Sequence, residues 1–159
     1  MIWLRALSFV VAVQLTVVGV IPWLLARVGP RLPVGLWHWL GLVPLTIGTL
    51  ALLWCNWAFV RRGRGTAAPY DPPRTLVVQG LYCHVRNPMY VSAALIVLGI
   101  GLWTSAAILL AYSLLLALSY HVFVRYYEEP HLKGVFGQSY AKYCAAVPRW
   151  WPRLTAWRS

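Results

Sequence analysis

Apolar residues along the chain gather in four long runs, separated by segments rich in Gly, Pro or Arg. The first run, residues 7–26, holds no charged side chain over 20 positions. As a helix it extends about 30 Å, which matches the hydrocarbon core of a bilayer. It is longer than the apolar part of a typical signal peptide, so we expect a retained span. The second run, about residues 37–60, predicts a span with kinks at Pro44 and Gly48.

The last two runs predict a tight helical hairpin. Residues 90–103 form a short apolar run, which Thr104-Ser105 joins to the longer run 106–126. The loop 61–86 and the tail after the fourth run contain no span. The pattern therefore predicts an all-α integral membrane protein with about four transmembrane helices, formed by a single domain over residues 1–159.

The tail carries a further helical pattern, with apolar residues at spacings i, i+3, i+4 and i+7. These residues are Tyr140, Tyr143, Cys144 and Val147. Together with Trp150, Trp151 and nearby basic residues, they predict an interfacial C-terminal helix with an aromatic anchor. The loop 61–88 is long, and long loops are usually functional. We therefore expect the site where this loop and the tail meet the hairpin.

The charges of the loops predict the orientation of the spans. If the N-terminus lies inside, twelve of the 14 basic residues lie on the inner side, and only Arg27 and Arg31 lie outside. Cytoplasmic loops carry an excess of Lys and Arg, so both termini are expected to be cytoplasmic.

Composition excludes several classes of protein. The chain is 60% hydrophobic and only 11% charged, whereas soluble domains are near half apolar and a quarter charged. Its mean hydropathy is +0.64. In such a chain the net charge of +11 indicates loops facing an anionic leaflet rather than nucleic acid. Cys55, Cys83 and Cys144 lack CxxC spacing and indicate unpaired thiols, neither a disulfide framework nor a metal site.

Acidic residues are rare, which makes each one informative. Glu128 and Glu129 are expected to end the fourth helix, because Pro130 cannot continue it smoothly. Carboxylates at a helix C-terminus face the negative end of the macrodipole and need a compensating cation. Arg125, one turn earlier, can pair with one of them. Asp71 precedes two prolines and is explained by turn formation.

The stretch 80–90 is the richest in chemical groups. Gly80 permits a turn, Asn87 is a good N-cap, and Pro88 suits the first position of the third helix. Backbone N–H groups at this helix start are natural donors for a carboxylate. The stretch also holds more polar and aromatic side chains than capping requires: Tyr82, His84, Arg86 and Tyr90.

Two motifs carry a resemblance to a known family. The run Leu76-Val77-x-x-Gly80-x-Tyr82-x-x-x-Arg86-Asn87-Pro88-x-Tyr90 resembles the signature of the isoprenylcysteine carboxyl methyltransferases and their bacterial relatives. The run Glu128-Glu129-x-x-Leu132-x-x-x-Phe136-Gly137-x-x-Tyr140-x-x-Tyr143-x-x-x-Val147-Pro148 is similar to the C-terminal motif of that family. The resemblance covers about residues 74–152.

The resemblance implies a membrane methyltransferase that uses S-adenosylmethionine (SAM), and, for a relative of bacterial type, a location in the inner membrane. No metal is expected. The implied cofactor-binding residues are Arg74, Thr75, Leu76, Val77, Tyr82, Asn87, Pro88, Met89, Tyr90 and Glu128. The catalytic candidates are Glu129 and His84, each available as a base, and Arg125. Eukaryotic members usually carry His at the position of Asn87, so a role that requires imidazole there is in doubt.

The sequence leaves the methyl acceptor open. The resemblance implies a lipophilic small molecule or lipid that enters from the bilayer, in the manner of a prenylcysteine carboxylate, with a phospholipid amine as the main alternative. A four-helix transporter would be expected to carry an acidic residue within a span, and none is present. A non-catalytic membrane protein that keeps the motifs for structural reasons is the third interpretation.

Overall fold

The computed structural model describes residues 10–62, 76 and 78–157. All regular elements in these ranges are helical: the π-helix Val10–Val20, α2 (Ile21–Leu25), α3 (Trp37–Leu40), α4 (Leu42–Arg62), the 3-10 helix Gly80–Cys83, α5 (Pro88–Trp103), α6 (Ala107–Phe123), the π-helical segment Val124–Glu128, and α7 (Glu129–Ala146). An isolated bridge between Arg31 and Ala106 is the β pairing recorded among these residues. The described part of the chain is therefore all-α, as predicted.

Two helical runs in the described residues are long and apolar enough to cross a membrane. They are Trp37–Ala58, with 22 residues, and Ala107–Ala146, with 40. Two shorter apolar helices accompany them, Ala12–Leu25 and Pro88–Trp103. The longer run bends at Gly137, whose φ of 53° and ψ of −126° are not helical. The part before this bend, residues 107–136, would extend about 45 Å as a straight helix, which is longer than a hydrocarbon core of about 30 Å. The predicted crossing of the membrane by all four helices stays a prediction.

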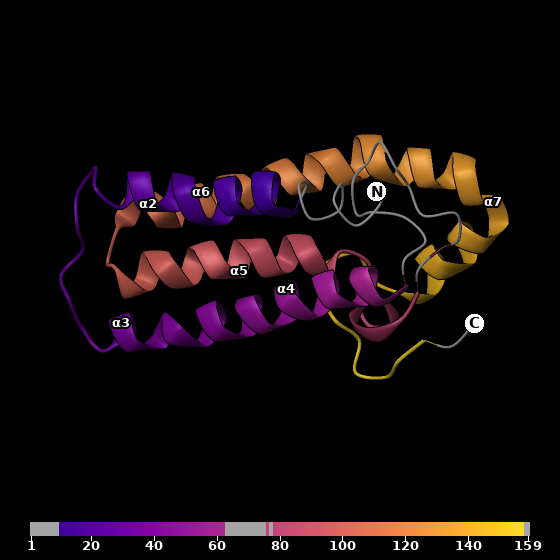
Figure 1. Ribbon diagram of the computed structural model, residues 1–159, viewed down its shortest axis with the longest axis horizontal. Coiled ribbons are helices and arrows are strands. Elements are labelled where there is room, and N and C mark those ends of the chain that lie inside the picture. The colour runs from indigo at the N-terminus through magenta and orange to yellow at the C-terminus, as the bar shows by residue number, and fades with distance from the viewer. Residues whose placement is uncertain (1–9, 63–75, 77, 158–159) are drawn as a thin grey trace.

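Helix α5 lies at the centre of the bundle, between α4 and α6 (Figure 1). Glycines allow α4 to approach it closely, as is common where apolar helices pack together. A Cβ atom on Gly48 would lie 2.8 Å from the Ser92 carbonyl oxygen, and one on Gly99 would lie 2.5 Å from the Leu45 nitrogen. Gly48 therefore serves close packing, and α4 continues through it. The break in this span lies at Gly41, between α3 and α4.

The predicted hairpin is confirmed. Helix α5 ends at Trp103 and α6 begins at Ala107, with Ser105 in the left-handed region at φ 54°. The Ile100 carbonyl accepts from the Thr104 backbone N–H at 2.8 Å and from the Thr104 hydroxyl at 2.7 Å, at the end of α5. The Ser113 hydroxyl donates to the Ala94 carbonyl at 3.0 Å and ties the two helices together.

The expected end of the fourth helix before Pro130 is wrong. Helix α6 continues through the π-helical segment Val124–Glu128 into α7, where Pro130 occupies the first turn. A proline cannot donate to the carbonyl four residues earlier, and the wider π turn changes the hydrogen-bond spacing at this point. Glu128 and Glu129 therefore lie within a continuous helical run. They are not at a helix C-terminus, so they do not face the negative end of a helix macrodipole as expected.

The apolar face predicted for an interfacial helix is instead buried within the protein. Tyr140, Tyr143 and Val147 are 3%, 3% and 1% exposed and form one core cluster. The partly buried residues that pack against it are Leu76, Val78, Leu132, Phe136, Cys144, Ala146 and Trp157. This face of α7 therefore covers the chain before α5 and the tail. Trp151, by contrast, is 82% exposed.

Candidate functional site

The tail after α7 lies along the segment that precedes α5. Val147 leaves the helical conformation at φ −114°, ψ 125°, and Pro148 follows it. Three backbone hydrogen bonds join the two segments: Arg86 N to Pro148 O at 2.9 Å, Arg153 N to His84 O at 3.0 Å, and Trp157 N to Cys83 O at 3.0 Å. Residues 83–86, at the end of the loop, and the tail therefore lie together although they are far apart in sequence, as the sequence predicted.

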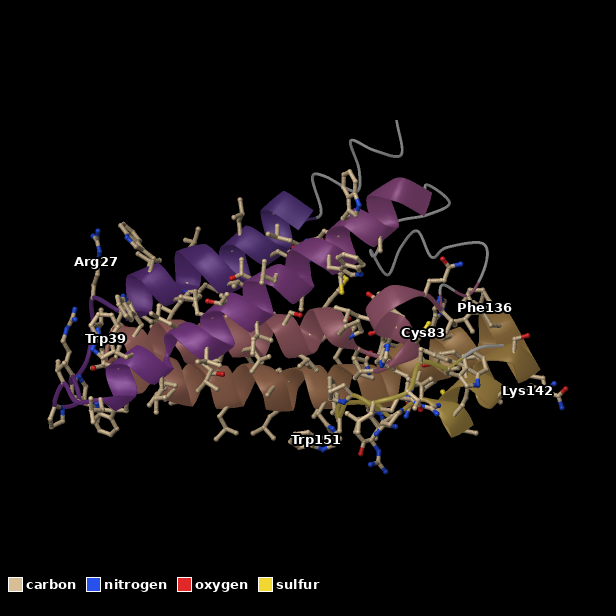
Figure 2. All side chains as sticks on the ribbon, turned by 90° about the horizontal axis from the view of Figure 1, so that it is seen from below. Arg27, Trp39, Cys83, Phe136, Lys142 and Trp151 are labelled. Atoms are coloured by element: carbon tan, nitrogen blue, oxygen red, sulfur yellow. The ribbon has the colours of Figure 1, made fainter. Side chains whose placement is uncertain are left out.

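The tail also turns back along α6 (Figure 2). The indole N–H of Trp150 donates to Nδ1 of His121 at 3.1 Å. Because this nitrogen accepts, the proton of the neutral His121 imidazole lies on Nε2. The contact fixes the tail against the end of the hairpin. Trp150 thus has a specific partner in the protein, in addition to any contact with lipid.

Glu129 is held by two guanidinium groups. Its Oε1 accepts from Arg86 Nη1 at 2.8 Å and from Arg149 Nε at 2.7 Å, and its Oε2 accepts from Arg149 Nη2 at 2.8 Å. Glu129 is 8% exposed. The hydrogen bonds with Glu129 raise the pKa of Arg149 above its usual value. Arg86 also lies 3.0 Å from the Cys144 sulfur.

Arg125 does not form the ion pair expected of it. The salt bridges among the described residues join Glu129 to Arg86 and to Arg149. Arg125 is exposed, and its guanidinium carbon lies 5.8 Å from the centre of the Tyr126 ring. Arg125 lies one helical turn before Glu129 as expected, but Arg86 and Arg149, which are farther away in sequence, pair with Glu129 instead.

Glu128 faces a different group of residues. The Tyr90 hydroxyl donates to Glu128 Oε2 at 2.8 Å, and the Tyr90 ring packs on Tyr120 with 4.5 Å between centroids. Two residues of the candidate cofactor site, predicted from motifs 38 positions apart, are thereby in direct contact. Tyr120, on α6, was not predicted.

Tyr82 lies beside the same pair. Its side chain is hydrogen-bonded to Cys55 of α4, and its carbonyl accepts from the Tyr143 hydroxyl at 2.7 Å. Burial raises the pKa of the Tyr82 phenol well above its usual range, and the neighbouring Cys55 and Glu128 raise it further. Tyr82 is therefore a neutral hydroxyl at physiological pH. The carboxylate of Glu128 thus has two aromatic neighbours, Tyr82 from the segment before α5 and Tyr90 from α5 itself.

Asn87 occupies the N-cap position of α5 as predicted, but its side chain makes no capping hydrogen bond. Its Nδ2 instead donates to the Arg149 carbonyl at 3.2 Å. Pro88 is at the start of the helix and is buried. The amide of Asn87 therefore fastens the tail and does not occupy the N–H groups of the first turn of α5.

His84 Nδ1 lies 2.8 Å from the Arg153 carbonyl oxygen. A carbonyl only accepts, so this nitrogen carries the proton, and Nε2 holds the lone pair of the neutral ring. His84 is half-buried beneath the tail. Its ring is oriented by the same segment that supplies Arg149.

The remaining predicted residues are less informative. Arg74, Thr75 and Val77 lie outside the described residues. Leu76 packs on the Tyr140–Tyr143–Val147 cluster, and Met89 is half-buried near the start of α5.

Sequence reasoning gave no site role to Arg149, Tyr120 or Cys55. One basic residue, Arg125, cannot pair with both adjacent acids. This imbalance indicates a further cation from elsewhere in the chain, such as Arg149. Tyr120 lies on an apolar helix without a motif, and the sequence offers no signal for its contact.

Comparison with known proteins identifies the family. The profile of a family described as phospholipid methyltransferase matches residues 36–139, which include both the segment before α5 and the two glutamates. Two curated proteins are similar: the cobalt-zinc-cadmium resistance protein CzcN of Cupriavidus metallidurans, 33% identical over 120 residues, and the nickel-cobalt-cadmium resistance protein NccN of Alcaligenes xylosoxydans xylosoxydans, 31% identical over 120 residues. Each alignment covers 75% of this chain.

This chain spans about half the length of these relatives, 50% and 51%. No solved structure matches. Within the described residues, no group of three or more His, Cys, Asp or Glu side chains gathers to hold a metal ion. Because the family profile covers more than half of its residues, the chain belongs to the phospholipid methyltransferase family.

Proposed function

We propose that this protein transfers a methyl group from S-adenosylmethionine to a lipophilic acceptor at the cytoplasmic face of a membrane. The family supports a membrane methyltransferase. The observation that carries the cofactor assignment is the contact of Glu128 with Tyr90, at the start of α5 and beside Tyr82. These three residues come from both motifs that suggested the cofactor.

The chemistry of this group fits the cofactor. The Tyr90 hydroxyl takes one oxygen of Glu128, so the carboxylate keeps further acceptor capacity for a ribose hydroxyl or an ammonium group. The N–H groups of the first turn of α5, which Asn87 does not cap, suit a carboxylate. The ring faces of Tyr82 and Tyr90 suit a sulfonium cation. SAM supplies the activated methyl group.

The protein's contribution to the transfer is mainly alignment and exclusion of water, because methyl transfer is a direct displacement. A carboxylate acceptor is ionised at neutral pH and requires no base. For an acceptor that must lose a proton, His84 is the favoured candidate, since its Nε2 holds a lone pair while Arg153 orients the ring. Both oxygens of Glu129 are engaged by guanidinium groups, which disfavours Glu129 as a base.

We further propose that the acceptor is held as in the isoprenylcysteine carboxyl methyltransferases and enters from the bilayer. The apolar outer surfaces of α4 and α6 support contact with lipid: Leu50, Leu53, Leu114, Leu115 and Leu118 are each more than half exposed. The name of the matching family keeps a phospholipid amine as the alternative acceptor. Both acceptors place the reacting group at the membrane surface, beside the tail.

Methyl-labelled SAM tests the proposal. The purified protein, reconstituted with a bacterial phospholipid extract or with a prenylcysteine analogue, is expected to move the label into the organic phase. Base-labile label would indicate an ester, and base-stable label an amine. An absence of labelled product with both acceptors, together with no binding of S-adenosylhomocysteine (SAH), would overturn the proposed function.

A further inference from the structure

Three separate parts of the chain meet at one carboxylate. Glu129 is the first residue of α7, Arg86 precedes α5, and Arg149 belongs to the tail. The side chains of Arg86, Glu129 and Arg149 are 12%, 10% and 25% exposed in these ion pairs. Arg149 binds through Nε and Nη2 to both oxygens of Glu129, the bidentate geometry that makes such pairs specific. We call these three residues the Glu129 clamp.

Two members of the clamp are next in sequence to a residue of the candidate cofactor site, and the third is hydrogen-bonded to such a residue. Glu129 follows Glu128, and Arg86 precedes Asn87 and the first turn of α5. The Arg149 carbonyl accepts from the Asn87 side-chain amide, and the Arg149 guanidinium binds Glu129, so one tail residue contacts both segments. A displacement of Arg149 would therefore move both Glu128 and the first turn of α5. The family profile ends at residue 139, before this tail.

Resting on the proposed function, we propose that Glu129 and Arg149 are positioning residues, through which the C-terminal tail completes the cofactor site. The clamp fixes the distance between Glu128 and the first turn of α5, the two places that hold opposite ends of the cofactor. Glu129 then acts through its neighbours and takes no proton. The tail therefore contributes to cofactor binding and is not only a membrane anchor.

The geometry distinguishes positioning from base catalysis. A base needs a free lone pair within reach of the acceptor, whereas Glu129 is buried and both of its oxygens accept from guanidinium groups. Removal of one partner of a buried pair leaves an unpaired charge, which strains the surrounding segments. Loss of either Glu129 or Arg149 is therefore expected to damage the same arrangement.

A double-mutant cycle on the full chain tests the inference. The variants are Glu129→Gln, Arg149→Gln, their combination, and Arg149→Lys. Lys142→Gln is the matched control, because Lys142 is an exposed basic residue of α7 that points away at the far end of this helix (Figure 2). SAH affinity is measured by calorimetry, and transfer of label from SAM to a lipid extract is followed at rising SAM concentration.

Each single substitution is expected to weaken SAH binding by about tenfold, because Glu128 or the first turn of α5 is displaced and loses a hydrogen bond to the ligand. The double variant should bind no worse than the weaker single variant, and Arg149→Lys should recover part of the affinity. Transfer should return towards the parent rate at saturating SAM, since positioning changes KM rather than kcat. Lys142→Gln should behave like the parent.

Three results would overturn the inference while leaving the proposed function intact: parent-like SAH binding in both single variants, additive losses in the double variant, or Glu129→Gln that binds SAH normally but loses rate at saturating SAM. The last result would identify a base. If Glu129→Gln does not fold, Arg149→Gln decides the question, because Arg149 lies in the tail outside the helices. Failure of the parent to bind SAH would instead overturn the proposed function itself.

Discussion

The hydroxyl of Tyr90 donates to a carboxylate oxygen of Glu128 at 2.8 Å, which joins the first turn of α5 to the end of the π-helical segment that follows α6. The two residues come from separate motifs. Their contact fixes where a carboxylate and an aromatic ring meet beside a helix start. If this pair holds the cofactor, substitution of either residue should weaken cofactor binding.

Glu128→Gln is expected to weaken SAH binding by about ten- to a hundredfold, the equivalent of losing roughly 1.5–3 kcal/mol from a hydrogen bond to a charged group. The fold should persist, because the amide still accepts from Tyr90. Calorimetric titration measures the affinity, with gel filtration and circular dichroism as checks on folding. Asp71→Asn, at a position assigned by sequence to a turn, is the control. Parent-like binding by Glu128→Gln would remove Glu128 from the site.

Tyr90→Phe keeps the ring against Tyr120 and removes only the hydroxyl that binds Glu128. We expect SAH affinity to fall by a few-fold to about tenfold, roughly 0.5–1.5 kcal/mol, because Glu128 loses the hydroxyl that orients it towards the ligand. Tyr126→Phe is the matched control, because Tyr126 is 71% exposed on the neighbouring π-helical segment. Equal effects of the two substitutions would show that the hydroxyl of Tyr90 has no special role.

Two glycine substitutions test the packing of the bundle. A Cβ on Gly99 would lie 2.5 Å from the Leu45 backbone nitrogen, so Gly99→Ala should push α5 from α4 and cost about 1–3 kcal/mol. Gly134 on α7 has no atom within 4 Å of the added carbon, and Gly134→Ala should stabilise by roughly 0.5–1 kcal/mol. Thermal unfolding in detergent measures both. A lower midpoint for Gly134→Ala than for Gly99→Ala would contradict this packing.

The distribution of Lys and Arg predicts that both termini face the cytoplasm. A reporter fused after Ser159 that works only in the cytoplasm should therefore be active, and one that works only outside should be silent. The opposite pattern would reverse the orientation and place the Glu129 clamp on the outer face.

Hydrophobic periodicity and turn residues predict the helices and the hairpin, because these features depend on neighbours in the sequence. The α5–α6 hairpin follows from two apolar runs around a two-residue turn. Its ends at the turn, Trp103 and Ala107, lie within one position of the predicted ones. The helix end predicted at Pro130 is absent, because the effect of a proline depends on the hydrogen-bond register around it. The π-helical segment Val124–Glu128 changes that register, and no sequence pattern marked it.

The candidate site was predictable in its members but less so in its contacts. The two motifs predict that Tyr90 and Glu128 belong to one site, and the two side chains are in contact in the structure. Helical spacing assigned Arg125 to the acids, whereas Glu129 is paired with Arg86 and Arg149, 43 and 20 residues away. Long-range partners of this kind depend on how the tail returns to the loop, and helical periodicity carries no information on that path.

Binding of SAH to the purified parent protein is the most direct measurement of the central claim. A ligand specific to the folded state stabilises it, by about 2.7 kcal/mol at one hundred times its Kd. We predict saturable binding by calorimetry and a thermal midpoint that rises with SAH concentration. A well-folded, monodisperse sample that shows neither heat of binding nor a shift at millimolar SAH would contradict the assignment of this site to a methyltransferase cofactor.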